Sequence, residues 1–163
     1  MTARIHLRET WAPALAVLDA AGLRPGARVL DVGCGRGDAT LAAACRVGPS
    51  GLVLGVDASL PPLEDARRRA ADAGLGHVGF VHGDAQTQRF AALRFDVIIG
   101  ARGLDVFADA DAGVTNLTRA LRGGGRLALT APDDPTRVRA ILQRAGLVVD
   151  AVATGVVTAN APA

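Results

Sequence analysis

The stretch Val29-Leu-Asp-Val-Gly-Cys-Gly-Arg-Gly-Asp-Ala39 decides the fold. Its first half belongs to an apolar run of strand character, Arg28–Gly33, and its second half begins an alanine-rich helical pattern. Between them stand three alternating glycines, Gly33, Gly35 and Gly37. Glycines at a turn let the backbone bend sharply and approach a ligand where side chains would collide. The stretch therefore predicts a strand-turn-helix unit with a ligand site at its turn.

The same alternation of strand and helix continues along the chain. Further strands are expected at Leu52–Asp57, Val78–His82, Phe95–Gly100 and Arg126–Thr130, the last one behind the turn Gly123-Gly124-Gly125. Helices are expected at roughly Leu7–Ala21, at Ala39–Val47, after Pro61-Pro62 and at Thr136–Ala145. Two β-rich runs, Leu147–Ala153 and Val156–Ala159, close the chain as a hairpin through Thr154-Gly155. The pattern predicts an α/β fold whose doubly wound, mostly parallel sheet has seven strands and a C-terminal antiparallel hairpin.

A chain of 163 residues, 50% apolar and 21% charged, predicts one folded domain. We expect its core at residues 28–160 and a helical N-terminal cap within residues 1–24. The net charge of +2 gives little attraction toward nucleic acid or an anionic membrane, so neither is an expected partner. All 18 basic residues are arginine, which we attribute to a GC-rich, bacterial coding sequence.

Cysteine use and hydropathy indicate where the protein works. Cys34 and Cys45 form no CxxC pair, and two cysteines cannot make a disulfide framework. The apolar stretch Trp11–Leu18 is too short to span a membrane. We therefore expect a cytoplasmic protein.

Three kinds of ligand site can be compared at the glycine-rich turn. A phosphate-binding loop of the form GxxxxGK[ST] is excluded, because the chain contains no lysine. A dinucleotide-binding GxGxxG would need glycine at position 38 or 40, where Asp38 and Thr40 stand. Asp31, two residues before Gly33, would repel a pyrophosphate and suits a cationic ligand.

The segment Asp31-Val-Gly-Cys-Gly-Arg-Gly37 resembles the D/E-x-G-x-G-x-G signature of class I S-adenosylmethionine-dependent methyltransferases. The resemblance extends in order to Gly55-Val-Asp-Ala-Ser59, Gly83-Asp-Ala85, Phe95–Ile99 and Leu121–Leu127, and so covers nearly the whole chain. It implies a Rossmann-like fold, S-adenosylmethionine as methyl donor and S-adenosylhomocysteine as product.

The resemblance also implies roles for single residues. Asp57 matches the acid that binds the ribose hydroxyls, and Asp84 matches the acid that accepts from the adenine amino group. The cofactor site is expected to comprise Asp31, Gly33, Cys34, Gly35, Gly37, Asp57, Ala58, Asp84, Ala85 and Gly100. Each has a structural alternative: the glycines can serve the turn alone, Asp57 can cap the next segment, and Asp84 can hold a turn. The spacing from Gly37 to Asp57 also suits a nicotinamide-binding acid, so Asp57 alone does not discriminate.

Methyl transfer needs an in-line nucleophile and positioning, with a general base for some oxygen or nitrogen acceptors. Asp105 is the candidate base and Arg102 could orient an anionic acceptor, while His6 could reach the site if the N-terminal helix folds over it. A helix cap, a surface charge and a structural histidine are the respective alternatives. No metal site is expected, since His77 and His82 face opposite sides of a strand.

The shortness of the chain shapes the expected acceptor site. Thr130–Pro135 leads almost directly into the next helix, which leaves little chain to build a pocket. We expect a shallow acceptor site completed by a second copy or by a partner subunit. The acceptor would be a small molecule, such as a natural product, or a group presented by a carrier. The alternative is a protein that binds S-adenosylmethionine without methyl transfer, as a cyclase-like catalyst or accessory subunit.

Overall fold

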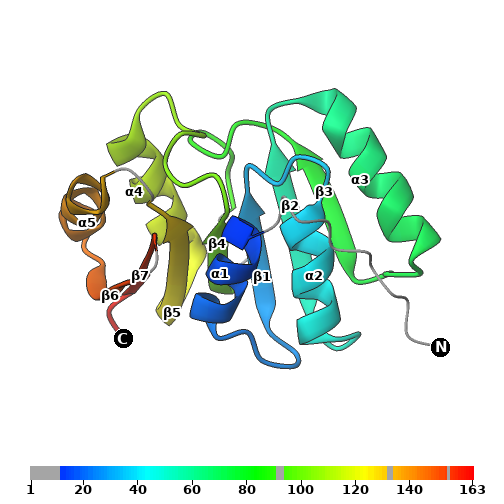
Figure 1. Cartoon of the computed structure of the whole chain (residues 1–163), viewed down its shortest axis with the longest axis horizontal. Coiled ribbons are helices and arrows are strands. Elements are labelled where there is room, and N and C mark those ends of the chain that lie inside the picture. The colour runs from blue at the N-terminus through cyan, green and yellow to red at the C-terminus, as the bar shows by residue number, and fades with distance from the viewer. Residues whose placement is uncertain (1–11, 91–93, 132–133, 154) are drawn as a thin grey trace.

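The computed structural model describes residues 12–90, 94–131, 134–153 and 155–163. A single seven-stranded sheet runs through them in the order β3-β2-β1-β4-β5-β7-β6 (Figure 1). The strands are β1 (Arg28–Val32), β2 (Leu52–Asp57), β3 (Val78–His82), β4 (Phe95–Gly100), β5 (Leu121–Thr130), β6 (Val148–Ala153) and β7 (Val156–Asn160). The helices are α1 (Ala12–Ala21), α2 (Asp38–Val47), α3 (Leu60–Asp72), α4 (Ala110–Ala120) and α5 (Pro135–Arg144).

Strands β1 to β5 are parallel, and β7 pairs antiparallel with both β5 and β6. The expected seven-stranded sheet with a closing hairpin is therefore confirmed. Its two faces carry separate apolar cores. On one face, α1 and α2 pack over β1, β2 and β4, and on the other, α4 and α5 pack over β4, β5 and β7. Helix α3 lies against the edge strand β3.

The structure differs from the sequence expectation at β5. This strand begins at Leu121 instead of Arg126, so the three glycines lie inside it. Its pairing with β4 jumps from Phe95–Leu121 to Val97–Arg126, and Gly124 has a φ of 68°. The glycines therefore form a bulge in one long strand, because two flanking segments pair with the same neighbour.

The helices also refine the expectation. Helix α4 had no expected bounds, and it is held at its start by the Asp109 side chain, which accepts a hydrogen bond from the Ala112 N–H. The described part of the N-terminal helix is Ala12–Ala21, and its expected first residues lie outside the described chain, as does Thr154 of the hairpin. Among the helices that the structure describes, none is long and apolar enough to cross a membrane.

The topology decides where a ligand can bind. Strands β1 and β4 lie at the centre, and the chain turns to opposite faces after them. Open α/β sheets bind ligands at the carboxyl ends of their strands, beside such a switch point. Asp31 in β1 and Asp57 at the end of β2 lie at this edge, and Asp84 follows β3 directly.

Candidate functional site

Two adjoining hollows lie at the carboxyl edge of the sheet. The first, about 250 Å³, is bordered by Asp31, Gly33, Cys34 and Gly35 and is called the glycine hollow below. The second, about 340 Å³, is bordered by Asp57, Ala58, Gly83, Asp84 and Ala85 and is called the acid hollow. Gly33 and Arg102 line both, so the two hollows lie side by side at the ends of β1, β2 and β3.

The glycines of the motif do different work. Gly33 has a φ of 68°, and a Cβ there would run into the Val106 side chain, so the loop after β4 closes directly over it. Gly35 has a φ of 52° and open space where its Cβ would stand, which leaves the hollow free above it. Gly37 and Gly100 border neither hollow. A Cβ at Gly37 would lie 3.0 Å from the Ala66 Cβ, and one at Gly100 would lie 2.6 Å from the Leu129 Cδ2. The absent side chain allows close packing at both positions, and their expected cofactor role stays a prediction.

Asp31 is the most unusual group of the glycine hollow. Its side chain is buried, and Thr40 Oγ1 donates a hydrogen bond of 2.6 Å to its Oδ2. Burial raises the pKa of Asp31 to about 7, against the lowering effect of the Thr40 bond, and the nearby Asp57 raises it further. A buried carboxylate is costly unless it is paired, and no described cation forms an ion pair with Asp31. The hollow therefore favours a cationic ligand group.

Asp57 is held in place by backbone donors. The Gly35 N–H donates to its Oδ2 at 2.8 Å, and the Ser59 N–H donates to its Oδ1 at 2.9 Å. Each carboxylate oxygen has a second lone pair, so the group can still accept two hydroxyls. The carboxylate is thus fixed in orientation while its acceptor capacity toward the acid hollow remains.

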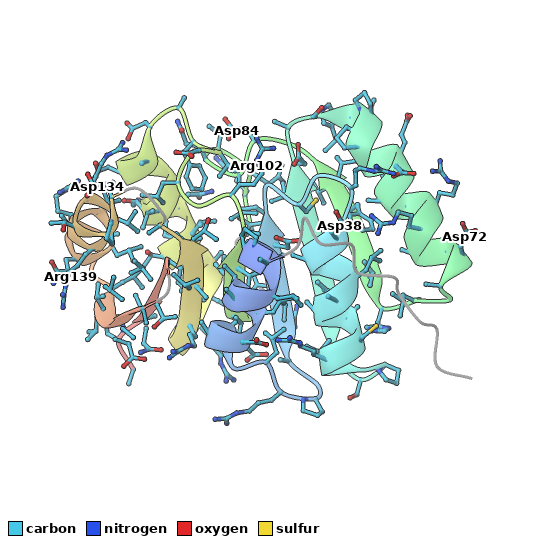
Figure 2. All side chains as sticks on the ribbon, in the orientation of Figure 1. Asp38, Asp72, Asp84, Arg102, Asp134 and Arg139 are labelled. Atoms are coloured by element: carbon cyan, nitrogen blue, oxygen red, sulfur yellow. The ribbon has the colours of Figure 1, made fainter. Side chains whose placement is uncertain are left out.

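Asp84 lies across the same hollow and is exposed. Its Oδ1 accepts a hydrogen bond of 2.8 Å from the Gln86 N–H, which fixes the turn after β3. Figure 2 shows Asp84 and Arg102 at the same edge of the molecule, where both border the acid hollow. The Asp84 carboxylate therefore retains acceptor capacity at the border of the acid hollow, and its expected role toward an amino group stays a prediction.

The cysteine of the motif is a packing residue. Cys34 is buried, and its Sγ lies 2.8 Å from where a Cβ on Gly55 would stand. Burial raises the pKa of the Cys34 thiol, and the carboxylates of Asp31 and Asp57 raise it further. The thiol is therefore protonated at neutral pH and is not an activated nucleophile.

Neither described histidine belongs to the site. His77 Nε2 lies 3.1 Å from the Ala44 carbonyl oxygen, and His82 Nε2 lies 3.0 Å from that of Ala58. Within the described ranges, no group of three or more His, Cys, Asp or Glu side chains is placed to hold a metal ion. His6 lies outside the described residues, so its expected role stays a prediction.

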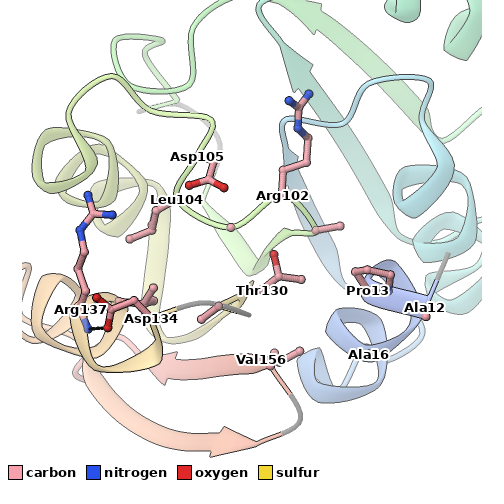
Figure 3. A pocket seen from close by; sticks show the side chains of 15 residues that line it. Ala12, Pro13, Ala16, Arg102, Leu104, Asp105, Thr130, Asp134, Arg137 and Val156 are labelled. Carbon is pink, nitrogen blue, oxygen red and sulfur yellow. Dashed lines mark hydrogen bonds between the residues drawn. The ribbon is translucent and has the colours of Figure 1, made fainter. Parts of the chain in front are cut away.

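A larger cavity of about 700 Å³ adjoins both hollows (Figure 3). The start of α1, the loop after β4, the end of β5, the first turn of α5 and the start of β7 all border it. Its wall is mostly apolar and includes Pro13, Ala16, Leu104, Val138 and Val156. We call it the apolar cavity. A cavity of this size and lining suits a small organic molecule.

The two expected reaction residues stand where the spaces meet. Arg102 borders the apolar cavity and both hollows, and Asp105 borders the apolar cavity and the acid hollow. Both side chains are exposed. The structure therefore brings together the loop residues that the sequence singled out.

Sequence reasoning missed the far wall of the apolar cavity. Asp134 and Arg137 of the α5 start border it, and the Arg137 N–H donates a hydrogen bond of 2.8 Å to the Asp134 side chain. The pattern Asp-Pro-x-Arg is typical of a capped helix start and predicts Asp134 as the N-cap residue. The local sequence does not indicate that this helix start lies across the cavity from the loop after β4.

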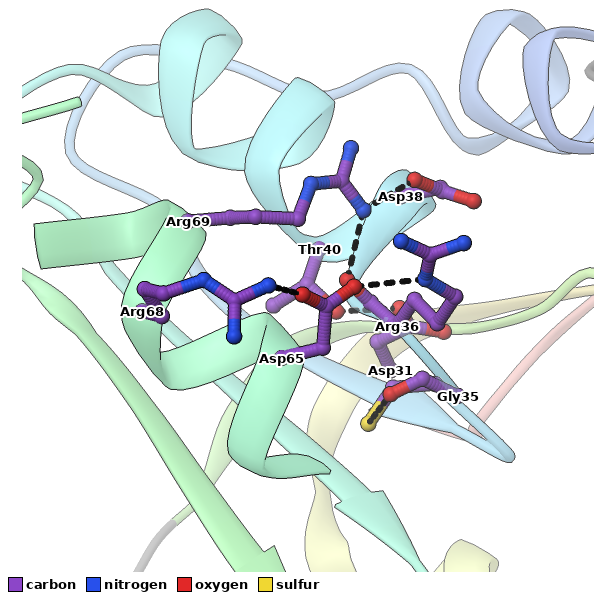
Figure 4. A network of polar contacts seen from close by, with 9 residues as sticks. Asp31, Gly35, Arg36, Asp38, Thr40, Asp65, Arg68 and Arg69 are labelled. Atoms are coloured by element: carbon purple, nitrogen blue, oxygen red, sulfur yellow. Dashed lines mark hydrogen bonds and ion pairs between the residues drawn. The ribbon is translucent and has the colours of Figure 1, made fainter. Parts of the chain in front are cut away.

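A network of ion pairs fastens the glycine-rich turn to α3 (Figure 4). Arg36 and Arg68 both pair with Asp65, the first at 2.5 Å, and Arg69 pairs with Asp38. Arg69 also donates a hydrogen bond of 2.7 Å to the Arg36 carbonyl oxygen. The turn is thus fastened to α3 by side chains, of which Arg36 and Asp38 also border the glycine hollow.

Comparisons with known proteins agree with this geometry. A family model described as a methyltransferase domain matches residues 23–154. Nocamycin O-methyltransferase of Saccharothrix syringae is 40% identical over 149 residues, which are 90% of this chain and 53% of that protein. The ubiquinone/menaquinone biosynthesis C-methyltransferase UbiE of Hahella chejuensis is 37% identical over 120 residues, 73% of this chain and 48% of that one. The chain thus spans about half the length of these relatives.

A solved structure extends the likeness of the fold. A SAM-dependent methyltransferase from Aquifex aeolicus superposes with a TM-score of 0.80 at 22% identity, covering 94% of this chain and 93% of that one. The family match, the two relatives and the glycine motif at the end of β1 lead to one assignment. The chain belongs to the class I S-adenosylmethionine-dependent methyltransferase family.

Proposed function

We propose that the protein binds S-adenosylmethionine across the glycine and acid hollows and transfers its methyl group to a small molecule in the apolar cavity. One observation carries the proposal. Arg102 borders the glycine hollow, the acid hollow and the apolar cavity, and Asp105 borders the acid hollow and the apolar cavity. The named activities of the relatives, O-methylation and C-methylation of small molecules, support the reaction class.

The residues present fit this donor. A buried, unpaired carboxylate at Asp31 suits the cationic methionine end of the molecule. Asp57, oriented by two backbone N–H groups, suits the two ribose hydroxyls, and Asp84 with Ala85 suits the adenine. When bound, the donor supplies a methyl group on a sulfonium sulfur.

The chain itself contributes positioning and proton transfer. Positioning of two reactants can supply on the order of 7–11 kcal/mol of the barrier reduction. In this proposal Asp105 takes the proton of an acceptor hydroxyl or acidic carbon, which its position at the border of the apolar cavity and the acid hollow supports. Arg102, which borders the same cavity, would orient a polar group of the acceptor, and the apolar part of the wall would exclude water from the reaction.

The proposal is tested by turnover and binding together. The protein is incubated with S-adenosylmethionine labelled in its methyl group and with the small-molecule extract of a GC-rich bacterium. Protein-dependent label in an organic product is expected, and Asp105→Asn should lower the rate at least tenfold, far more than it changes the affinity for S-adenosylhomocysteine. Asp72→Asn, an exposed carboxylate on α3, is the control and should change neither.

Two outcomes would contradict the proposal in different ways. Tight binding of donor and product without label in any acceptor would favour the non-methylating alternative. Failure of both to bind at millimolar concentration would remove the cofactor assignment. A carrier-presented acceptor, a second copy or partner subunit at the acceptor site, and a cytoplasmic location stay predictions from the sequence.

A further inference from the structure

Two pairs of oppositely charged side chains border the apolar cavity, and only one pair lies next to the two hollows. Arg102 and Asp105 lie where the cavity meets the hollows, while Asp134 and Arg137 border the apolar cavity alone. Figure 3 shows the two arginines on opposite sides of the cavity, with Asp105 between them along its rim. A molecule that fills the cavity therefore has one end near the donor and another near the start of α5.

Arg137 stands beside two carboxylates that are already engaged. Asp134 Oδ1 accepts from the backbone N–H of Arg137 at 2.8 Å and so caps α5. Asp111 of α4 is bound by Arg144 through two hydrogen bonds, Nε to Oδ1 at 2.8 Å and Nη2 to Oδ2 at 2.9 Å. Among the described residues, the Arg137 guanidinium forms no ion pair and donates no hydrogen bond.

An unpaired guanidinium at the wall of an apolar cavity is a recognition group for a planar anion. Its fork of N–H donors matches a carboxylate with two parallel hydrogen bonds. Arg137 also lies in the first turn of α5, where the helix dipole favours negative charge. Arg137 is exposed, so its guanidinium is accessible to a ligand, and the same cavity wall includes the apolar side chains of Leu104 and Val138.

We propose that Arg137 anchors the methyl acceptor by binding a carboxylate or similar planar anion, an inference that rests on the proposed function. This anionic group lies away from the atom that is methylated. The acceptor is then an apolar, ring-sized molecule with an acid at one end and its nucleophile at the other, beside Asp105. The anchor fixes which end of the acceptor faces the donor. Arg137 is a specificity-determining residue, and Arg102 remains the orienting group at the reacting end.

The test uses a matched pair of probes and three variants of the full chain. Anthraquinone-2-carboxylate and its uncharged amide have the same ring system, and their binding is measured by calorimetry in the presence of saturating S-adenosylhomocysteine. The wild-type protein should bind the carboxylate at least tenfold more tightly than the amide. Arg137→Gln should remove this preference by weakening the carboxylate alone, and Arg137→Lys should retain part of it because the charge is kept.

Arg139→Gln is the matched control, because Arg139 is exposed on the same helix, points outward and does not border the cavity (Figure 2). It should leave both probes unchanged. Equal affinity of the two probes for the wild-type protein, an equal loss in Arg137→Gln and Arg139→Gln, or no binding of either probe would overturn the anchor. S-adenosylhomocysteine affinity is measured on every variant and should stay constant, so loss of the anchor is distinguishable from loss of the donor site.

Discussion

Between β1 and β3 the carboxyl edge of the sheet is shaped by backbone groups and buried acids, whereas beyond β4 it is shaped by apolar side chains and exposed charges. On the donor side, two N–H groups hold Asp57 and an ion-pair network holds the glycine-rich turn. On the acceptor side, Arg102, Asp105 and Arg137 have no described ion-pair partner. One side is preorganised for a fixed ligand, and the other side presents groups that a variable ligand can engage.

The largest expected effect comes from steric crowding at Gly33, in the part of the site proposed to bind the methyl donor. Gly33→Ala places a methyl group against Val106 and the Arg102 side chain, on a backbone with a φ of 68°. We expect S-adenosylhomocysteine affinity to fall at least 100-fold, because the loop after β4 must move off both hollows. Calorimetry of product binding measures the effect.

Gly74→Ala separates backbone strain from crowding. Gly74 has a φ of 67°, nearly that of Gly33, and open space around its missing Cβ. It should lose stability by about 1 kcal/mol through the left-handed backbone and keep its affinity for the product. Equal losses of affinity in both variants would show that the loop contact is unimportant.

The second effect concerns the ribose assignment. Asp57→Asn keeps the size of the side chain but replaces one acceptor oxygen with a donor that faces the Gly35 or Ser59 N–H. We expect product binding to weaken by about 1–3 kcal/mol, or roughly 10- to 100-fold. Unchanged calorimetric affinity would remove Asp57 from the donor site, and Asp72→Asn again serves as the surface control.

A third prediction uses pH to distinguish the two sides. The Asp31 carboxyl, with Asp57 and Asp38 nearby, has a pKa raised from 3.8 to about 7. The folded protein therefore holds a proton there that the unfolded chain has lost. The raised pKa of Asp31 contributes to the free energy of unfolding in full below about pH 4, and this contribution is lost as the pH rises to about 7.

Donor binding should respond in the opposite direction. A bound cation favours ionised Asp31, so S-adenosylmethionine affinity should rise up to about tenfold per pH unit toward pH 7 and level off above it. Titration calorimetry from pH 5.5 to 8.5 measures the slope. Asp31→Asn should flatten it, whereas Asp105→Asn on the acceptor side should leave it unchanged. A slope retained in Asp31→Asn would assign the titration to another group.

The same comparison explains how far the sequence could predict the molecule. The donor side follows from local patterns, because strand ends, glycines and the acids after them are neighbours in sequence as well as in space. Asp31, Asp57 and Asp84 lie at one edge of the sheet, as the pattern predicts. Gly37 and Gly100 belong to the same pattern but pack against Ala66 and Leu129, a distinction that needs side-chain coordinates.

The lining of the apolar cavity could not be predicted from local sequence patterns. Its wall joins α1, the β4 loop, α5 and the start of β7, and its lining residues Ala12 and Val156 are 144 positions apart in the chain. Nothing in the sequence distinguishes Arg137 from Arg139. Helix α4 had no expected bounds for a related reason. Its sequence contains Gly113 and several threonine or asparagine residues of weak helix propensity, and Gly113 is needed because Phe107 occupies the place of a side chain.

The smallest expected effect tests whether the outer network matters for binding. Asp65→Asn removes the partner of Arg36 and Arg68. Solvent-exposed ion pairs contribute less than about 1 kcal/mol, so the melting temperature should fall by a few degrees at most. Product affinity should fall two- to threefold, because Arg36 stands in the glycine-rich turn and borders its hollow.

Asp111→Asn is the matched variant on the acceptor side, since it breaks the pair between Asp111 and Arg144 that joins α4 to α5. It should lower the melting temperature by a similar amount without changing product affinity, because neither residue borders a hollow. If both variants bind the product as the wild type does, the ion pairs of Asp65 take no part in ordering the glycine-rich turn for binding. If only Asp65→Asn weakens binding, its ion pairs take part in preorganising the donor side, and the contrast between the two sides extends to their surfaces.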